Sequence, residues 1–115
     1  QGDVVLDPFL GTGTTILSAM ASMRNSIGIE IDNNFSNVIA LRIKDIIDFS
    51  KEYNKSRIGN HMEFVNKREK EKGELGYKSK IYGFPIMTRQ EINIKIPKLI
   101  GLREIDINNY EIEYE

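Results

Sequence analysis

The segment over residues 3–23 constrains the fold of this chain more than any other. A short apolar run, Val4-Val5-Leu6, precedes a turn with two glycines, and an apolar stretch over 16–23 follows it. The first run is typical of a parallel strand covered on both faces, and the second predicts a helix packed between other elements. We therefore expect a strand, a tight turn and a helix that begins near Thr14 or Thr15, either of which can cap it.

A second strand and a second helix are predicted directly afterwards. Residues 26–31 form the expected strand, and Asp32 and Asn33 are candidate caps for the helix. The apolar residues of this helix recur at spacings of three, four and seven, and they are Phe35, Val38, Ile39, Ile43, Ile46 and Ile47. The order strand, helix, strand, helix with short turns predicts an α/β fold with parallel strands.

The second half of the chain has a different character. Residues 50–80 are polar and charged, and the stretch over 57–72 predicts a solvated helix. Alternating apolar and polar residues then predict two or three half-buried strands, over 77–87, 92–96 and 104–115. We expect two parts, namely a β-α-β-α segment over residues 1–50 and a C-terminal extension over residues 51–115.

Composition excludes several classes of protein. The formal net charge is -1 and the pI about 5.9, so overall charge gives no sign of nucleic-acid binding. The absence of cysteine removes disulfides, thiolate nucleophiles and cysteine zinc sites, and it fits a cytoplasmic protein. With one histidine, a metal site built from histidines is not expected, and no apolar run approaches the roughly 18 residues that span a membrane. Because the chain begins at Gln1 and runs at once into a strand, we expect a piece of a longer protein.

The glycine turn, defined as residues 7–15, has features in common with three kinds of ligand site. A phosphate-binding P-loop needs a lysine after its last glycine, but Thr14 and Thr15 stand there. A dinucleotide fingerprint needs a third glycine at the position of Ile16, so NAD or FAD is disfavoured. The third kind is a cofactor without a pyrophosphate, held by the turn and a nearby acid.

Glu30 favours this third kind of ligand. It is expected at the C-terminal end of the second strand, beside the turn, where ligands of open α/β sheets bind. A carboxylate there can accept both ribose hydroxyls of an adenosine, and Asp7 adds a second negative charge. Two carboxylates attract a cation and repel a diphosphate, which suits the sulfonium and ammonium groups of S-adenosylmethionine.

The string Asp-Pro-Phe-x-Gly-x-Gly-Thr-Thr, preceded by Gly-Asp-Val-Val-Leu and followed by Ile-Gly-Ile-Glu-Ile-Asp, resembles the cofactor region of site-specific DNA amino-methyltransferases. The resemblance covers Gly2 to about Ile47. It implies a Rossmann-like S-adenosylmethionine-dependent methyltransferase fold, a partial parallel sheet with flanking helices, here with a small strand-rich C-terminal extension. The cofactor-binding residues that it implies are Asp7, Pro8, Phe9, Gly11, Gly13, Thr14, Glu30 and Ile31. In this pattern the turn lines the methionine end, Glu30 holds the ribose and Ile31 lies against the adenine.

The catalytic loop of this family, Asp- or Ser-Pro-Pro followed by Tyr or Phe, is absent because Pro8, Pro85 and Pro97 are isolated. In the family this loop holds the amino group of a flipped base. No catalytic residue is therefore expected in this chain, and the loop is expected in an N-terminal region or a separate chain. The segments 57–65 and 82–85 look similar to the C-terminal ends of some cytosine-N4 members, which favours cytosine N4 over adenine N6.

The resemblance implies the cofactor-binding part of a restriction-modification enzyme that acts on double-stranded DNA, without a membrane or metal partner. Two alternatives stay open: a non-catalytic S-adenosylmethionine-binding remnant or subunit, and a nicotinamide-dependent oxidoreductase fragment. The run over 67–80 has six basic and three acidic side chains, which is typical of a solvated face and also compatible with contact to DNA phosphates. His61 is expected to be a surface or packing residue.

Overall fold

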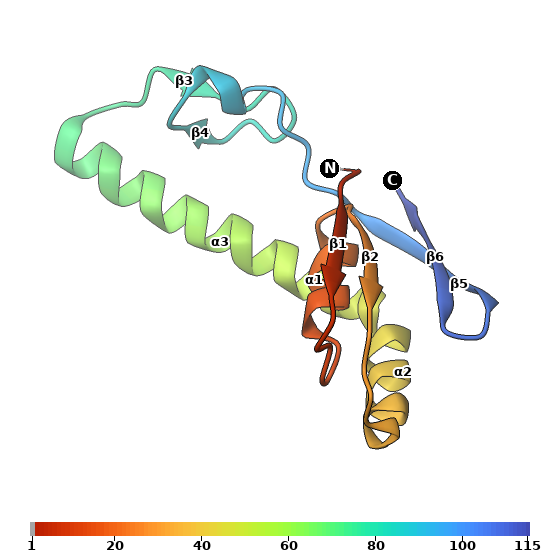
Figure 1. Cartoon of the computed structure of the whole chain (residues 1–115). Helices are drawn as coiled ribbons and strands as arrows, with labels where there is room; N and C mark the ends of the chain where they lie inside the picture. The colour runs from red at the N-terminus through yellow and green to blue at the C-terminus, as the bar shows by residue number, and fades with distance from the viewer. Residues whose placement is uncertain (1) are drawn as a thin grey trace. The chain divides into compact units, whose positions relative to one another are not determined.

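The computed structural model describes residues 2–115, so Gln1, with which the predicted piece begins, lies outside the described residues. Two compact units make up the chain. Unit 1 contains the residues up to Lys51 together with Pro97–Glu115, and unit 2 is Glu52–Ile96 (Figure 1). The structure thus groups the end of the chain with its beginning, whereas the sequence analysis grouped it with the charged segment.

Unit 1 begins with a strand, a helix and a parallel strand. β1 (Val4–Asp7) and β2 (Asn25–Gly28) pair in parallel, and α1 (Thr14–Ala21) joins them. The predicted strand-turn-helix and the parallel pair are therefore confirmed. The predicted threonine cap is wrong, because the N-cap is Gly13 in the left-handed conformation and the Thr15 hydroxyl donates instead to Asp7.

The two-stranded parallel sheet is covered on one face rather than on two. Along both strands exposed residues alternate with half-buried ones. Val4, Leu6 and Ile27 are 63%, 61% and 56% exposed, so their face of the sheet is open in the described part of the chain. The expectation of a strand covered on both faces is wrong for residues 2–115, because α1 packs on one side alone.

The predicted second helix is divided into shorter elements. The Asp32 carboxylate accepts a hydrogen bond from the Asn34 N–H and caps the 3-10 turn η1 (Asn33–Phe35), as its position predicted. α2 (Ser36–Lys44) follows directly, and the chain then leaves helical geometry at Asp45.

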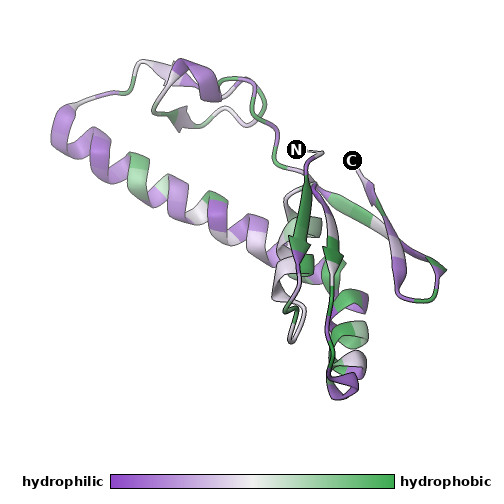
Figure 2. Ribbon diagram, viewed as in Figure 1, coloured by the Kyte–Doolittle hydropathy of each residue, from purple (hydrophilic) through white to green (hydrophobic). Residues whose placement is uncertain are grey.

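α3 (Ile46–Lys72) is the longest element and contributes residues to both units. It begins well before the residue predicted from the charged stretch, because Ile46 and Ile47 of the apolar stripe form its first turn. Figure 2 shows the change of character along the helix, since hydrophilic residues dominate its C-terminal part. None of the helices in residues 2–115 is both long and apolar enough to cross a membrane.

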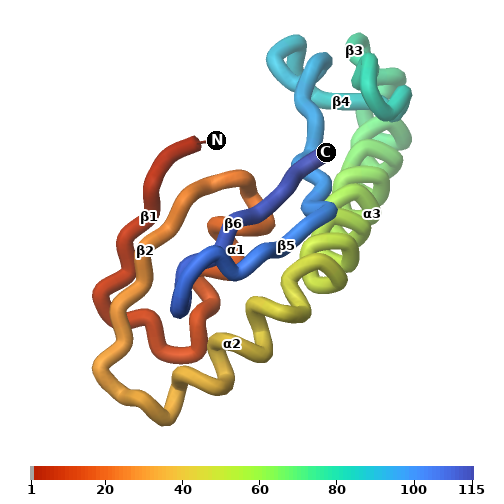
Figure 3. Tube along the Cα trace, turned by 90° about the vertical axis from the view of Figure 1, so that its right-hand side faces the viewer, coloured from red at the N-terminus to blue at the C-terminus, as the bar shows by residue number. Residues whose placement is uncertain are grey.

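Unit 1 is completed by an antiparallel hairpin formed by β5 (Leu99–Asp106) and β6 (Asn109–Tyr114). Its inner side packs on α1, α2 and the start of α3 (Figure 3). The buried cluster is Leu17, Met20, Ile43, Ile46 and Leu99. The Tyr114 hydroxyl donates a hydrogen bond of 2.6 Å to the Met20 carbonyl, and burial raises the pKa of this hydroxyl. The hairpin therefore belongs to the same core as the first βαβ segment.

Unit 2 contains little regular strand. β3 (Tyr77–Lys78) and β4 (Pro85–Ile86) form a short antiparallel pair, and the 3-10 turn η2 (Arg89–Glu91) follows. The strand predicted over 92–96 is wrong, because these residues form no strand. His61 packs inside the unit, with Nε2 2.9 Å from the Pro85 carbonyl oxygen, in agreement with its expected packing role.

Candidate functional site

The glycine turn joins β1 to α1 through two residues with positive φ. Gly11 has φ +57° and Gly13 has φ +86°, values that side chains other than glycine rarely adopt. A Cβ atom on Gly11 would meet nothing within 4 Å, whereas one on Gly13 would lie 3.4 Å from Ile39 of α2. Both glycines are therefore needed for the conformation of the backbone, and a Cβ on Gly13 would make only an ordinary van der Waals contact with Ile39.

Asp7 holds the first part of the glycine turn. One carboxylate oxygen accepts a hydrogen bond of 3.0 Å from the Phe9 N–H, and the other accepts one of 2.5 Å from the Thr15 hydroxyl. The bonds from Thr15 and Phe9 lower the pKa of Asp7 below its ordinary value. Asp7 is thus an ionised carboxylate at the C-terminal end of β1.

Glu30 closes the turn from the side of β2. One carboxylate oxygen accepts a hydrogen bond of 2.6 Å from the Gly11 N–H, and the other accepts one of 2.8 Å from the Asp32 N–H. The residue is half-buried. Each oxygen of an ionised carboxylate can accept about two hydrogen bonds, so both oxygens keep acceptor capacity for a ligand. The structure places Glu30 beside the turn, as expected from the parallel order of the strands.

Gly28 has a role that the sequence analysis did not assign. A Cβ atom at this position would lie 2.6 Å from one methyl carbon of Leu10 and 2.9 Å from the terminal methyl of Ile16. Leu10 belongs to the glycine turn, is buried, and donates its N–H to the Ile29 carbonyl at 2.9 Å. The glycine inside the Ile-Gly-Ile-Glu string was the available signal, because a glycine within a strand marks a close approach of neighbouring groups.

Arg42 of α2 was also missed. Its Nη1 donates to the Thr12 carbonyl at 2.7 Å, to the Thr12 hydroxyl at 2.9 Å and to the Thr14 hydroxyl at 3.2 Å. The guanidinium therefore holds the outer side of the turn and sets a positive charge beside it. A signal was present, because Arg42 lies three residues after Ile39 and four before Ile46, on the apolar face of the predicted helix.

Two large apolar side chains stand exposed at the carboxyl ends of the strands. Ile31, directly after Glu30, is 96% exposed, and Phe9 in the turn is 88% exposed. Apolar side chains grouped near an acidic ligand site are typical of surfaces that a ligand or another protein segment covers.

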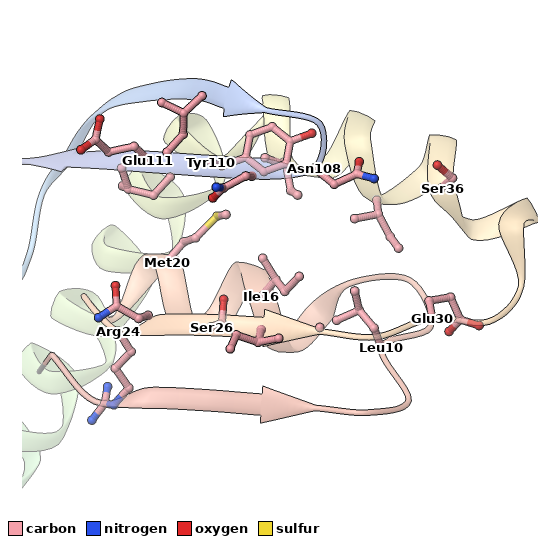
Figure 4. A pocket seen from close by; sticks show the side chains of 18 of the residues that line it. Leu10, Ile16, Met20, Arg24, Ser26, Glu30, Ser36, Asn108, Tyr110 and Glu111 are labelled. Carbon is pink, nitrogen blue, oxygen red and sulfur yellow. The ribbon is translucent and has the colours of Figure 1, made fainter.

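A cavity of about 1110 Å³ opens inside unit 1. Figure 4 shows Leu10, Ile16 and Ser26 on one side of it and Tyr110 of the hairpin on the other. Glu30 lies at its rim and is the one predicted cofactor residue in the lining of this cavity. The lining is apolar on its α1 side and polar toward Glu30, an arrangement typical of small-molecule sites.

The predicted cofactor residues therefore fall into two groups. Glu30 meets the turn through a hydrogen bond to Gly11 and also lines the cavity. The others belong to the glycine turn or, in the case of Ile31, follow Glu30, and they do not line the cavity; they are Asp7, Pro8, Phe9, Gly11, Gly13, Thr14 and Ile31. The geometry brings a carboxylate pair, free acceptor positions and exposed apolar groups to one end of the parallel sheet.

Comparison with known proteins identifies relatives of the chain. The model of a family described as DNA methylase matches residues 1–42. The type II methyltransferase M.MthZI of Methanothermobacter thermautotrophicus is 40% identical over 115 residues, which are 100% of this chain and 31% of that protein.

Shorter matches point in the same direction. The type II methyltransferase M.MjaI of Methanocaldococcus jannaschii is 46% identical over 57% of this chain and 20% of its own length. M.HinfI of Haemophilus influenzae, also a type II methyltransferase, is 52% identical over 38% of this chain and 12% of its own length. The chain spans 31% or less of these curated relatives, and no solved structure matches it.

Proposed function

Because this chain belongs to the family of DNA amino-methyltransferases, we propose that unit 1 is the S-adenosylmethionine-binding part of such an enzyme, with a Rossmann-like sheet. The reaction is transfer of a methyl group to the exocyclic amino group of a flipped base in double-stranded DNA, within a restriction-modification system. The catalytic Pro-Pro loop is supplied by an N-terminal region or a separate chain, so residues 1–115 bind cofactor and do not catalyse alone.

The observation that carries this proposal is the hydrogen bonding of the Glu30 carboxylate. Both of its oxygens are oriented by backbone N–H groups, from Gly11 and Asp32, and both keep acceptor capacity. A ribose presents two neighbouring hydroxyl donors, which match two neighbouring carboxylate oxygens. The bound cofactor would supply an electrophilic methyl group on a sulfonium.

Charge and surface polarity at the turn fit the same cofactor. Asp7 is held ionised by its two donors, and Glu30 adds a second carboxylate at the neighbouring strand end. This pair favours a cationic ligand over a diphosphate by the sign of the Coulomb energy. Ile31 offers an exposed apolar side chain next to Glu30 for an adenine ring. The residues present therefore suit S-adenosylmethionine better than a nicotinamide dinucleotide.

Cytosine N4 is favoured over adenine N6 as the methylated position. Two segments, 57–65 and 82–85, look similar to some cytosine-N4 enzymes. In the structure they pack together, since His61 contacts both Phe84 and Pro85. A contact between the two similar segments supports treating them as one feature of this subgroup.

The proposal is tested by calorimetric titration of the full chain with S-adenosylmethionine and with its demethylated product. We expect saturable binding that Glu30→Ala weakens about tenfold or more, because hydrogen bonds to a charged acceptor are lost. Asp48→Ala is the matched control, since Asp48 is an exposed carboxylate of unit 1 that pairs with Lys51, away from the turn. Unchanged affinity in folded Glu30→Ala, or preferential binding of NAD by the wild-type chain, contradicts the proposal.

A further inference from the structure

The two units carry opposite net charge, which the overall value of -1 conceals. Residues 52–96 contain ten Lys or Arg and six Glu, a net charge of +4. The remaining residues contain six Lys or Arg and eleven Asp or Glu, a net charge of -5. Any polyanionic partner is therefore attracted to unit 2 and repelled by unit 1.

The distribution of ion pairs increases the difference in charge between the two units. The ion pairs found in residues 2–115 are Lys51–Asp48, Lys98–Glu115 and Arg103–Glu111, and all three lie in unit 1. No Lys or Arg of the described unit 2 has a carboxylate oxygen within 4.0 Å of its charged nitrogens. Its cations are thus not held in ion pairs with the acids of unit 2, and residues 67–80 keep a net charge of +3.

Two glutamates of unit 2 are engaged by donors of their own segment. Glu69 accepts a hydrogen bond from the Leu75 N–H, and Glu91 accepts hydrogen bonds from the N–H and hydroxyl of Thr88. Both glutamates are half-buried. Glu69 thus stabilises the C-terminal end of α3, and Glu91 stabilises the turn η2, while the neighbouring lysines are exposed to solvent.

The exposed cations are concentrated around the end of α3 and the strand β3. The exposed lysines of this stretch, called here the basic segment, are Lys67, Lys70, Lys72, Lys78 and Lys80. Lys67 and Lys70 are three residues apart in α3, so they share a face of the helix. Five exposed ammonium groups within fourteen residues offer contacts to several phosphates.

Two aromatic side chains of unit 2, Tyr82 and Phe84, stack on each other, whereas Tyr53, Phe64 and Tyr77 are exposed. Phe84 contacts His61 and stacks on Tyr82 at 5.4 Å between ring centroids. The Tyr82 hydroxyl accepts a hydrogen bond of 2.9 Å from the Ile96 N–H. Residues 67–80 contain one exposed aromatic residue, Tyr77, and five exposed lysines, which suits contact with the phosphate backbone more than stacking on bases.

We infer that the basic segment of unit 2 is a contact surface for the phosphate backbone of duplex DNA. The inference rests on the proposed function, in which DNA is the substrate. It further identifies the part of this chain that contacts the DNA. Contacts of this kind position the duplex and depend on salt, and they carry no sequence preference of their own.

The test measures binding of the full chain to a short duplex DNA at several salt concentrations. We expect the combined variant Lys67→Gln, Lys78→Gln and Lys80→Gln to bind about tenfold more weakly or worse. The slope of log affinity against log salt is negative, and each lost phosphate contact reduces its magnitude by about 0.9, so the slope should become less steep by about 2 to 3. Duplexes of unrelated sequence should be affected equally.

The matched control is the combined variant Lys44→Gln, Lys51→Gln and Lys98→Gln, which removes the same charge from unit 1. It should keep the affinity and the slope. Equal losses in both variants, no change in the first, stronger binding to anionic lipid vesicles than to DNA, or no DNA binding by the wild-type chain would overturn the inference. Cofactor titration of the same variants separates this outcome from failure of the proposed function, because all six lysines lie outside the cofactor site.

Discussion

Unit 1 and unit 2 differ in how far apart in the sequence their contacts lie. The core of unit 1 joins α1 and α2 to the hairpin at the other end of the chain, as in the contact of Tyr114 with Met20. Unit 2 is one continuous segment, closed by contacts such as that of His61 with Pro85. A cofactor site requires groups held in fixed positions from several elements, whereas a phosphate-binding surface requires little more than exposed positive charge.

The largest effect on the free energy of unfolding is expected from a substitution in the core of unit 1. Ile46 is 0% exposed and belongs to the buried cluster. Replacing it in Ile46→Ala should cost about 2 to 5 kcal/mol in the free energy of unfolding, because a buried side chain of this size leaves a cavity. Urea unfolding followed by circular dichroism measures this value. A loss below about 1 kcal/mol would contradict the assigned core.

The same variant sharpens the comparison of the units. The chain has one histidine, His61, so its proton resonances report on unit 2 alone. If the units are stabilised by separate contacts, His61 should keep its folded chemical shift at urea concentrations where Tyr114 of unit 1 has lost its own. Simultaneous loss of both signals would show that the units unfold as one.

A smaller effect is expected from adding one methyl group at a glycine in each unit. Gly28→Ala introduces a Cβ within 2.6 Å of Leu10 and should destabilise the chain by about 1 to 3 kcal/mol through overpacking. The glycine turn should move with Leu10, so cofactor affinity should fall as well. Both quantities are measured, by urea unfolding and by calorimetry.

Gly59→Ala is the control for this change in unit 2. Gly59 lies inside α3 and a Cβ there would meet nothing within 4 Å. The substitution should therefore stabilise the chain by about 0.5 to 1 kcal/mol, since glycine is unfavourable inside a helix. If Gly28→Ala did not lower the free energy of unfolding relative to Gly59→Ala, the role given to Gly28 would have to be abandoned.

Arg42→Ala should affect the cofactor more than the fold. Three hydrogen bonds to Thr12 and Thr14 are lost at the edge of the turn, so we expect a roughly fivefold to tenfold weaker affinity for S-adenosylmethionine. Calorimetry measures this change. Lys44→Ala, an exposed basic residue of the same helix, should leave the affinity unchanged. Equal effects of the two variants would show that Arg42 acts only through general charge.

The smallest predicted effect concerns the protonation of Asp7. The Thr15 hydroxyl is the largest cause of its lowered pKa, so Thr15→Val should raise this pKa toward the ordinary value of 3.8. Because the pKa is depressed in the folded state, Asp7 stabilises the fold above pH 3.8, and this contribution disappears as the pH falls through the folded-state value. Carbon NMR of the carboxyl group measures the titration, with Ser18→Ala on the same helix as control. An unchanged titration in Thr15→Val would contradict the assigned hydrogen bond.

Much of unit 1 could be predicted because its signals are local. The apolar run before Asp7, the glycines at 11 and 13 and the cap at Asp32 each reflect the conformation of a few neighbouring residues. The place of Glu30 beside the turn follows from one further step, since parallel strands bring their carboxyl ends to one edge.

Other features depended on partners that a local pattern does not contain. The strand predicted over 92–96 had the right alternation, but a strand needs a neighbour to complete its hydrogen bonds, and none pairs with these residues among the described strands. The need for glycine at position 28 comes from Leu10, and the role of Arg42 comes from Thr12 and Thr14.

The sequence alone established the strand-turn-helix, the acid beside it and the resemblance to a methyltransferase cofactor region, because these depend on residue types at short and fixed spacings. Only the tertiary structure decided that the last strands complete unit 1, that Gly28 and Arg42 support the turn, and that the charge of the chain is divided between two units. Each of these is a relation between residues distant in sequence, and such relations arise when burial of apolar surface brings the elements together.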